Sequence, residues 1–239
     1  MSENRSARTL IDEIAEYTLK IGREISWFCD PLTPGRGRAY MLQHVLRNRL
    51  LSSVLRPAWM SRCTDLEVVR KTIGQIRQEL VMDDQIGTGH TAILRQMGRN
   101  VGLTDAEIDS VKAQPLVDAA FNIWENICRN RHWIAGWLTT SADEFILSRL
   151  PHNNFRPEAW KRTFNLNDDQ VFFFSYHLKA DEDHAGQQVW EPILRNVRSE
   201  AEREEIFAGL VSALIGEKLF YQGICEAGDA LDREHRETR

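Results

Sequence analysis

Cysteine is scarce in this chain of 239 residues, and its four copies are scattered at Cys29, Cys63, Cys128 and Cys225. None of them forms a CxxC pair, which excludes the usual spacing of a zinc knuckle or a dithiol redox site. In a reducing compartment such isolated thiols are commonly small packing residues. A chain of this length also buries enough apolar surface to fold without a cross-link. A bound metal would therefore serve function rather than structure.

The chain also lacks a long apolar run and an excess of basic residues. No uninterrupted apolar stretch approaches the roughly 20 residues of a membrane span. The opening Met-Ser-Glu-Asn-Arg has no apolar core of a secretory signal. The net charge of −5 argues against a phosphate-binding face. Local basic clusters such as Arg47, Arg49 and Arg56 are interpreted as solvated helix faces. We therefore expect a cytoplasmic protein that binds neither membrane nor nucleic acid.

Strand patterns are nearly absent, since only Val171–Phe174 is short, apolar and aromatic. Apolar residues instead recur at three- and four-residue steps, as in an amphipathic helix. We predict helices near residues 10–25, 38–55, 65–82, 90–98, from 104, 115–146, 170–194 and 201–220. The second should stop near Pro57, and the tail from Asp229 should fray. No repeat or low-complexity linker divides them. The expected fold is all-α: a single domain over residues 1–239, with frayed ends and about seven helices packed as a bundle.

The most informative stretch contains His177, Asp181 and His184. On a helix with about 100° per residue, positions i, i+4 and i+7 lie on one face. Two imidazoles and a carboxylate on one face are a ligand set for divalent iron, manganese or zinc. The spacing alone also arises by chance. Metal binding is favoured by the small Ala185 and Gly186 that follow and by the apolar residues 171–174 before it, because polar groups on a buried helix need partners.

Other candidate ligands are weaker when taken one at a time. His90 alone is typical of a core histidine, and Glu144 alone of an exposed acid at a helix end. Asp83, Asp84 and Glu79 are each typical of surface acids. Glu144, however, closes an apolar segment, where a buried carboxylate is costly unless it is paired or metal-bound.

Together these residues resemble the ligand pattern of heme-oxygenase-like diiron oxidases and oxygenases, which are relatives of the TenA and PqqC proteins. The resemblance covers nearly the whole chain and is closest in spacing to the para-aminobenzoate-synthase-like branch. That pattern has an acid seven residues before a histidine, a glutamate about fifty residues later, and HxxxDxxH some thirty residues beyond. Here the matching positions are Asp83, His90, Glu144 and then His177, Asp181 and His184.

The resemblance implies a heme-oxygenase-like fold that holds two Fe²⁺ ions, with a manganese–iron pair left open. Asp83, His90 and Glu144 would serve one ion, Glu144 would bridge, and the HxxxDxxH residues would serve the other. The family usually has glutamate where this chain has Asp83, and Glu79 is the alternative first acid. Dioxygen would be the co-substrate. The expected reactions are N-oxygenation of an amine, oxidative C–C cleavage or decarboxylation, and formation of an aromatic amine.

The substrate is expected to be a small molecule in an apolar pocket, and a homodimer is left open. The candidate pocket residues are Trp133, Trp137, Phe174 and Tyr176, although plain core packing explains them too. Two other hypotheses for the function remain. One is a metal-free relative of TenA or PqqC that works through general acids and bases. The other is a helical interaction protein without catalysis.

Overall fold

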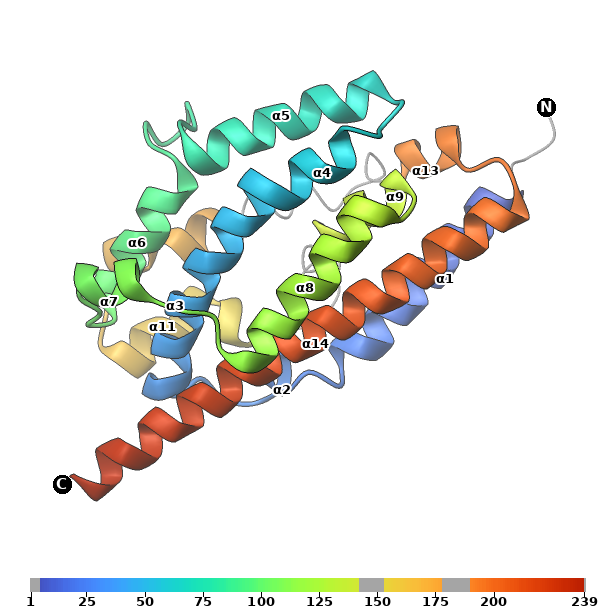
Figure 1. Cartoon of the computed structure of the whole chain (residues 1–239). Coiled ribbons are helices and arrows are strands. Elements are labelled where there is room, and N and C mark those ends of the chain that lie inside the picture. The colour runs from blue at the N-terminus through green and yellow to red at the C-terminus, as the bar shows by residue number, and fades with distance from the viewer. Residues whose placement is uncertain (1–4, 142–152, 178–189, 239) are drawn as a thin grey trace.

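The computed structural model describes residues 5–141, 153–177 and 190–238, and this part of the chain is helical without a strand (Figure 1). The all-α prediction is confirmed. The described residues contain twelve labelled α-helices rather than about seven, because several predicted helices are divided. The labelled elements are α1 (Arg5–Gly22), α2 (Ser26–Cys29), α3 (Pro34–Leu50), η1 (Leu51–Leu55), α4 (Arg56–Met60), α5 (Leu66–Leu80), α6 (His90–Asn100), α7 (Asp105–Ser110), α8 (Pro115–Asn130), α9 (Trp133–Thr139), η2 (Asn153–Phe155), α11 (Pro157–Phe164), η3 (Asp169–Val171), α13 (Glu191–Asn196) and α14 (Glu200–Glu237).

The longest helix, α14, is the central packing element. Its 38 residues begin at a capping box in which Ser199 and Glu202 satisfy each other's backbone amides. In Figure 1 it runs diagonally through the molecule, and it packs against α1, α3, α8 and α9. Leu210, Leu214 and Phe220 lie fully buried on it. One helix therefore joins the first and middle parts of the chain in a single apolar core.

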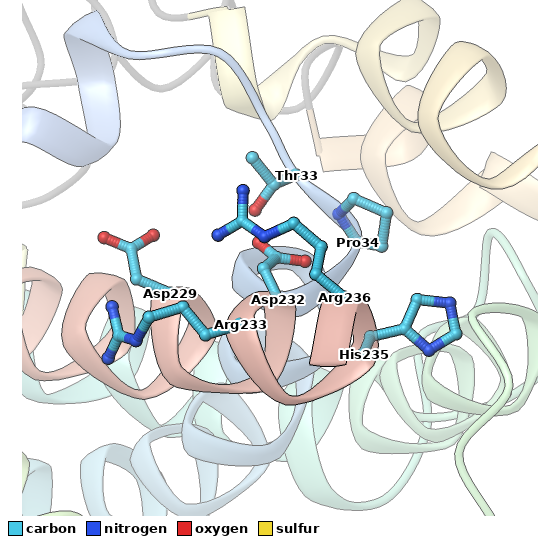
Figure 2. A pocket seen from close by; sticks show the side chains of 7 residues that line it. All are labelled: Thr33, Pro34, Asp229, Asp232, Arg233, His235 and Arg236. Atoms are coloured by element: carbon cyan, nitrogen blue, oxygen red, sulfur yellow. The ribbon is translucent and has the colours of Figure 1, made fainter. Parts of the chain in front are cut away.

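The last turns of α14 are anchored on the start of α3, so the predicted fraying from Asp229 is wrong. Asp232 Oδ1 accepts the amide hydrogen of Gly35 at 2.8 Å, and Arg36 donates to Asp229. Figure 2 shows Asp232 and Arg236 extending from α14 toward Thr33 and Pro34. The helices touch here: a Cβ on Gly228 would lie only 2.3 Å from Arg36 Cα.

The helix that follows Pro34 also runs further than the sequence pattern predicted. It starts at Pro34, whose ring is tolerated at a first helical turn, rather than near Arg38. It then passes Pro57, where we expected an end, because the π-helical turn η1 precedes α4. Proline lacks an amide hydrogen and crowds the carbonyl four residues earlier. A wider turn accommodates that ring without ending the helix.

The predicted helix 115–146 is broken before Trp133. The α8 helix ends at Asn130, and His132 becomes the N-cap of α9, with its Nδ1 accepting the amide hydrogen of Ile134 at 3.2 Å. A side-chain acceptor at this position favours a new helix start over continuation. No helix in the described part of the chain is long and apolar enough to cross a membrane.

A tight turn joins α5 to α6 and positions the candidate site. The carboxylate of Asp65 caps the start of α5, which ends at Leu80. Asp83 and Thr88 then form an isolated antiparallel bridge across the turn, and Gly87 adopts φ +70°. Glycine takes this left-handed conformation at little cost. The chain reverses within these few residues, and α6 begins directly at His90.

Candidate metal centre

Three of the predicted ligands meet where the α5–α6 turn faces the helical residues 172–177. His90 Nε2 lies 2.9 Å from Asp83 Oδ2, and the His90 and His177 rings have centroids 5.0 Å apart. Asp83 is only 2% exposed and His90 only 8%. A buried carboxylate and two imidazoles from separate elements are thus held together. Such groups are costly to bury without partners.

Glu79, the alternative first acid, lies at the same place. Its Oε1 is 3.3 Å from His90 Nδ1, on the opposite edge of the imidazole from Asp83. Asn48 on α3 donates to Glu79 Oε2 at 2.5 Å, and Thr91 in turn donates to Asn48 Oδ1. Both acids therefore contact His90, and the structure adds Glu79 to the site without removing Asp83.

The electrostatics of this cluster keep both acids ionised. Burial alone would raise the pKa of Asp83, but hydrogen bonds from Tyr176 and His90 outweigh it and lower that pKa to about 2. Burial likewise opposes ionisation of Glu79, yet His90 and the charge of Arg56 lower its pKa to about 2. Burial also acts to lower the pKa of His90, and the two carboxylates overcome this and raise it. The negative charge of the two ionised acids therefore favours a bound cation at this site.

Tyr176 is a direct partner of Asp83. Its hydroxyl donates to Asp83 Oδ2 at 2.5 Å, and its ring packs edge-on against His90. Burial and the bond to Asp83 raise the pKa of Tyr176 to about 12, so the phenol keeps its proton. The interaction joins residues 93 positions apart, and no local sequence pattern indicates it.

His177 makes a backbone hydrogen bond of a kind that is common among metal-binding histidines. Its Nδ1 lies 2.8 Å from the carbonyl oxygen of Phe173, which can only accept, so the ring donates from Nδ1. Metal-binding histidines commonly donate one ring N–H to a carbonyl in this way, which directs the lone pair of the other nitrogen to the ion.

The remaining predicted ligands, Glu144, Asp181 and His184, lie outside the described residues. Within those residues, no group of three or more histidine, cysteine or acidic side chains is by itself arranged to hold a metal ion. The donors that are described nevertheless fit iron, because they combine carboxylate oxygens with imidazole nitrogens and include no thiolate. His90 Nδ1 is also buried without a hydrogen bond of good geometry.

The four candidate pocket residues come from two segments of the chain and have different described partners. Trp133 is buried at the start of α9, and Trp137 packs against the apolar core. Phe174 stacks on Trp160 with ring centroids 4.4 Å apart, while Tyr176 faces Asp83. Their role in binding substrate stays a prediction.

Two cavities differ in their relation to this site. One of about 460 Å³ lies at the far end of α14, between charged residues that include Asp229, Arg233 and Arg236 (Figure 2). It contains none of the predicted ligands. A smaller cavity of about 260 Å³ lies beside α6 and includes Ile93 and Phe173, each one helical turn from a candidate ligand.

Comparisons with known proteins bear on the fold and on the family. A crystal structure of a domain of unknown function with a heme oxygenase-like fold, from Shewanella denitrificans, is similar with a TM-score of 0.65 at 13% identity. The alignment covers 92% of this chain and 91% of that one, so it shows the heme-oxygenase-like fold. A search of curated proteins found no match. Residues 43–215 match the family described as iron-containing redox enzymes, and this range includes every predicted metal ligand. The chain therefore belongs to the iron-containing redox enzyme family.

Proposed function

We propose that the protein is a non-heme diiron oxidase or oxygenase that uses dioxygen to oxidise a small organic substrate. The observation that carries the proposal is that the buried pair Asp83 and His90 lies against His177. Asp83 and His90 would hold one iron with Glu144 as the bridge. His177 would hold the second together with Asp181 and His184. A manganese–iron pair would use the same donors.

Two bound ferrous ions would supply two electrons, and the substrate would supply the other two needed to reduce dioxygen fully. The surrounding residues have their own tasks. Glu79 and Asp83 bring negative charge that favours a cation, and Asn48 holds Glu79 in place. Tyr176 keeps a proton on its oxygen beside Asp83, and the carbonyl of Phe173 fixes the orientation of His177. The low exposure of Asp83 and His90 excludes bulk water.

A metal-free enzyme is the second candidate, and the Asp83–His90 pair is the observation that favours it. A histidine beside an ionised acid, with a tyrosine hydroxyl nearby, is a competent general acid–base group. In that case iron would bind weakly or not at all, and the reaction would not depend on it.

Anaerobic titration of the full chain with Fe²⁺ tests the proposal. The wild type should bind two ions, and His90→Ala or His177→Ala should weaken binding by about tenfold or more, since even indirect partners of a metal matter that much. His235→Ala, at the distant end of α14, is the control and should bind like the wild type. Glu144→Ala should reduce the stoichiometry toward one ion.

Dioxygen consumption by the iron-loaded protein is then measured with an oxygen electrode. Uptake that requires iron and is lost in His90→Ala supports an oxidase or oxygenase. Iron binding without uptake, under any condition and with any substrate tried, overturns the use of dioxygen. Absence of iron binding favours the metal-free candidate.

A further inference from the structure

The cavity of about 260 Å³ beside α6 adjoins the candidate metal centre. Ile93 on its wall lies one turn after His90, and Phe173 lies one turn before His177. The rings of Phe173 and His177 have centroids 4.4 Å apart. The inner end of the cavity therefore lies next to two of the proposed ligands.

The two walls of this cavity run in opposite directions. His90 and His177 meet at one end, and Asn100 Nδ2 donates to the carbonyl oxygen of Gln170 at 2.7 Å at the other. Between these ends lie Ile93, Met97 and Phe173. The cavity thus lies between α6 and the segment 169–173, with Ile93 and Phe173 on the side nearer the two histidines.

The lining combines apolar and polar side chains. Ile93, Met97 and Phe173 are apolar, while Gln96, Asn100 and Gln170 carry amides and Asp169 carries a carboxylate. Phe172 borders it with an exposure of 42%, which is unusual for a phenylalanine in a folded domain. Such an exposed ring beside a cavity provides an apolar contact for a ligand.

Among the residues that the structure describes, the one charged member of the lining is an acid, Asp169. Asp169 has no ion pair among the described residues, whereas its neighbour Asp168 is bound by Lys161 at 2.8 Å. A ligand with a cationic group can pair with Asp169, and a carboxylate there would be repelled. The cavity is slightly smaller than typical ligand sites, so it suits a molecule of about ten non-hydrogen atoms.

We propose that this cavity binds the substrate, and that the substrate is a small apolar amine. Its ammonium group pairs with Asp169, and its apolar part lies along Ile93, Met97 and Phe173 toward His90 and His177. The identification of this ligand as the substrate rests on the proposed function, but its binding does not require iron. The proposal excludes carboxylic acids as substrates.

Isothermal titration calorimetry of the full chain without added iron tests the proposal with three probes of similar size. They are 2-phenylethylamine, 2-phenylethanol and 3-phenylpropanoate. The amine should bind about tenfold more tightly than the carboxylate, since one is attracted and the other repelled by an exposed charge. The alcohol should lie between them. Equal affinities, or tighter binding of the carboxylate, would overturn the proposal.

Matched variants locate the binding site. Asp169→Asn should reduce amine affinity by about twofold to fivefold, the range of an exposed ion pair. Asp168→Asn removes the adjacent charge and should leave the affinity unchanged. Ile93→Trp fills the cavity and should abolish binding, whereas Ala92→Trp places the same ring on the exposed side of α6 and should not. Circular dichroism verifies that each variant is folded.

Unchanged amine binding in a folded Ile93→Trp variant would place the amine elsewhere and overturn the proposal. The calorimetric result is independent of the oxygen electrode. If the amine binds as expected and the iron-loaded protein consumes no dioxygen, the binding site stands and the proposed oxidation fails. If dioxygen is consumed but the amine neither binds nor stimulates uptake, the proposed oxidation stands and the amine site fails.

Discussion

At the scale of single residues, the candidate centre depends on polar contacts between distant parts of the chain. Asp83 and His90 were paired by the resemblance to the family pattern, which has an acid seven residues before a histidine. They meet through a reversal of the chain, however, and not along one helix. The resemblance to diiron enzymes was sufficient to propose these ligands and His177. It could not indicate that Glu79 also contacts His90, because that contact depends on where α5 ends.

The contact between Tyr176 and Asp83 leads to a prediction at this scale. Tyr176→Phe removes the hydroxyl that donates to Asp83 Oδ2 and should raise the pKa of that carboxyl. Iron affinity should fall by about tenfold, because partners of metal ligands typically contribute that much. Competition between the protein and a chromophoric chelator measures it. Tyr17→Phe is the control, since Tyr17 packs edge-on against Phe207 and belongs to no predicted site. Equal losses in both variants would contradict a specific role for Tyr176.

At the scale of elements, periodicity identified most helices, and their ends were harder to predict. Apolar spacing located α1, α5 and α6 because their buried faces recur with the helical period. The predicted helix ends were wrong where tertiary contacts determine whether a helix continues. Asp229 belongs to a charged stretch that is typical of a fraying tail, yet Arg36 near the other end of the chain forms an ion pair with it. Pro57 predicts a helix end, yet the π-helical turn that precedes it accommodates its ring.

The crossing of α3 and α14 leads to a prediction at the scale of elements. Gly228→Ala places a Cβ against the backbone of Arg36 and should lower the free energy of unfolding by about 1–3 kcal/mol, as expected for overpacking. Gly74→Ala is the matched control within α5, because nothing lies within 4 Å of the added Cβ. It should raise stability by about 0.5–1 kcal/mol. Urea denaturation followed by circular dichroism measures both. Similar changes in both variants would mean that helix propensity, and not the close crossing of the two helices, determines the change in stability.

At the scale of the whole molecule, a buried ion pair joins residues 170 positions apart. Arg47 donates to Glu217 Oε1 at 2.6 Å, and the two side chains are 1% and 0% exposed. The guanidinium also lies 4.9 Å from the centre of the Trp124 ring and 4.8 Å from that of Phe220. Arg47 was expected on a solvated helix face, which is wrong because side chains of α14 cover it. A charge pattern within one helix cannot reveal a partner on another.

Removing one partner of this ion pair should strongly lower the free energy of unfolding. Glu217→Leu leaves the Arg47 charge buried and should cost about 3–5 kcal/mol of unfolding free energy. The double variant Arg47→Met, Glu217→Leu removes both charges while retaining much of the volume, and most of that stability should return. Equilibrium denaturation of the two single variants and the double variant measures the coupling. Losses that simply add would show that the two charges contribute independently.

The central place of α14 also has a consequence for the order in which the protein can fold during its synthesis. The helices that it contacts, α1, α3, α8 and α9, all leave the ribosome before it. Until residues 200–237 have emerged, Tyr17, Trp27 and Trp124 lack the aromatic rings of α14 that pack against them. A nascent chain paused before α14 would therefore present a wide apolar face to chaperones.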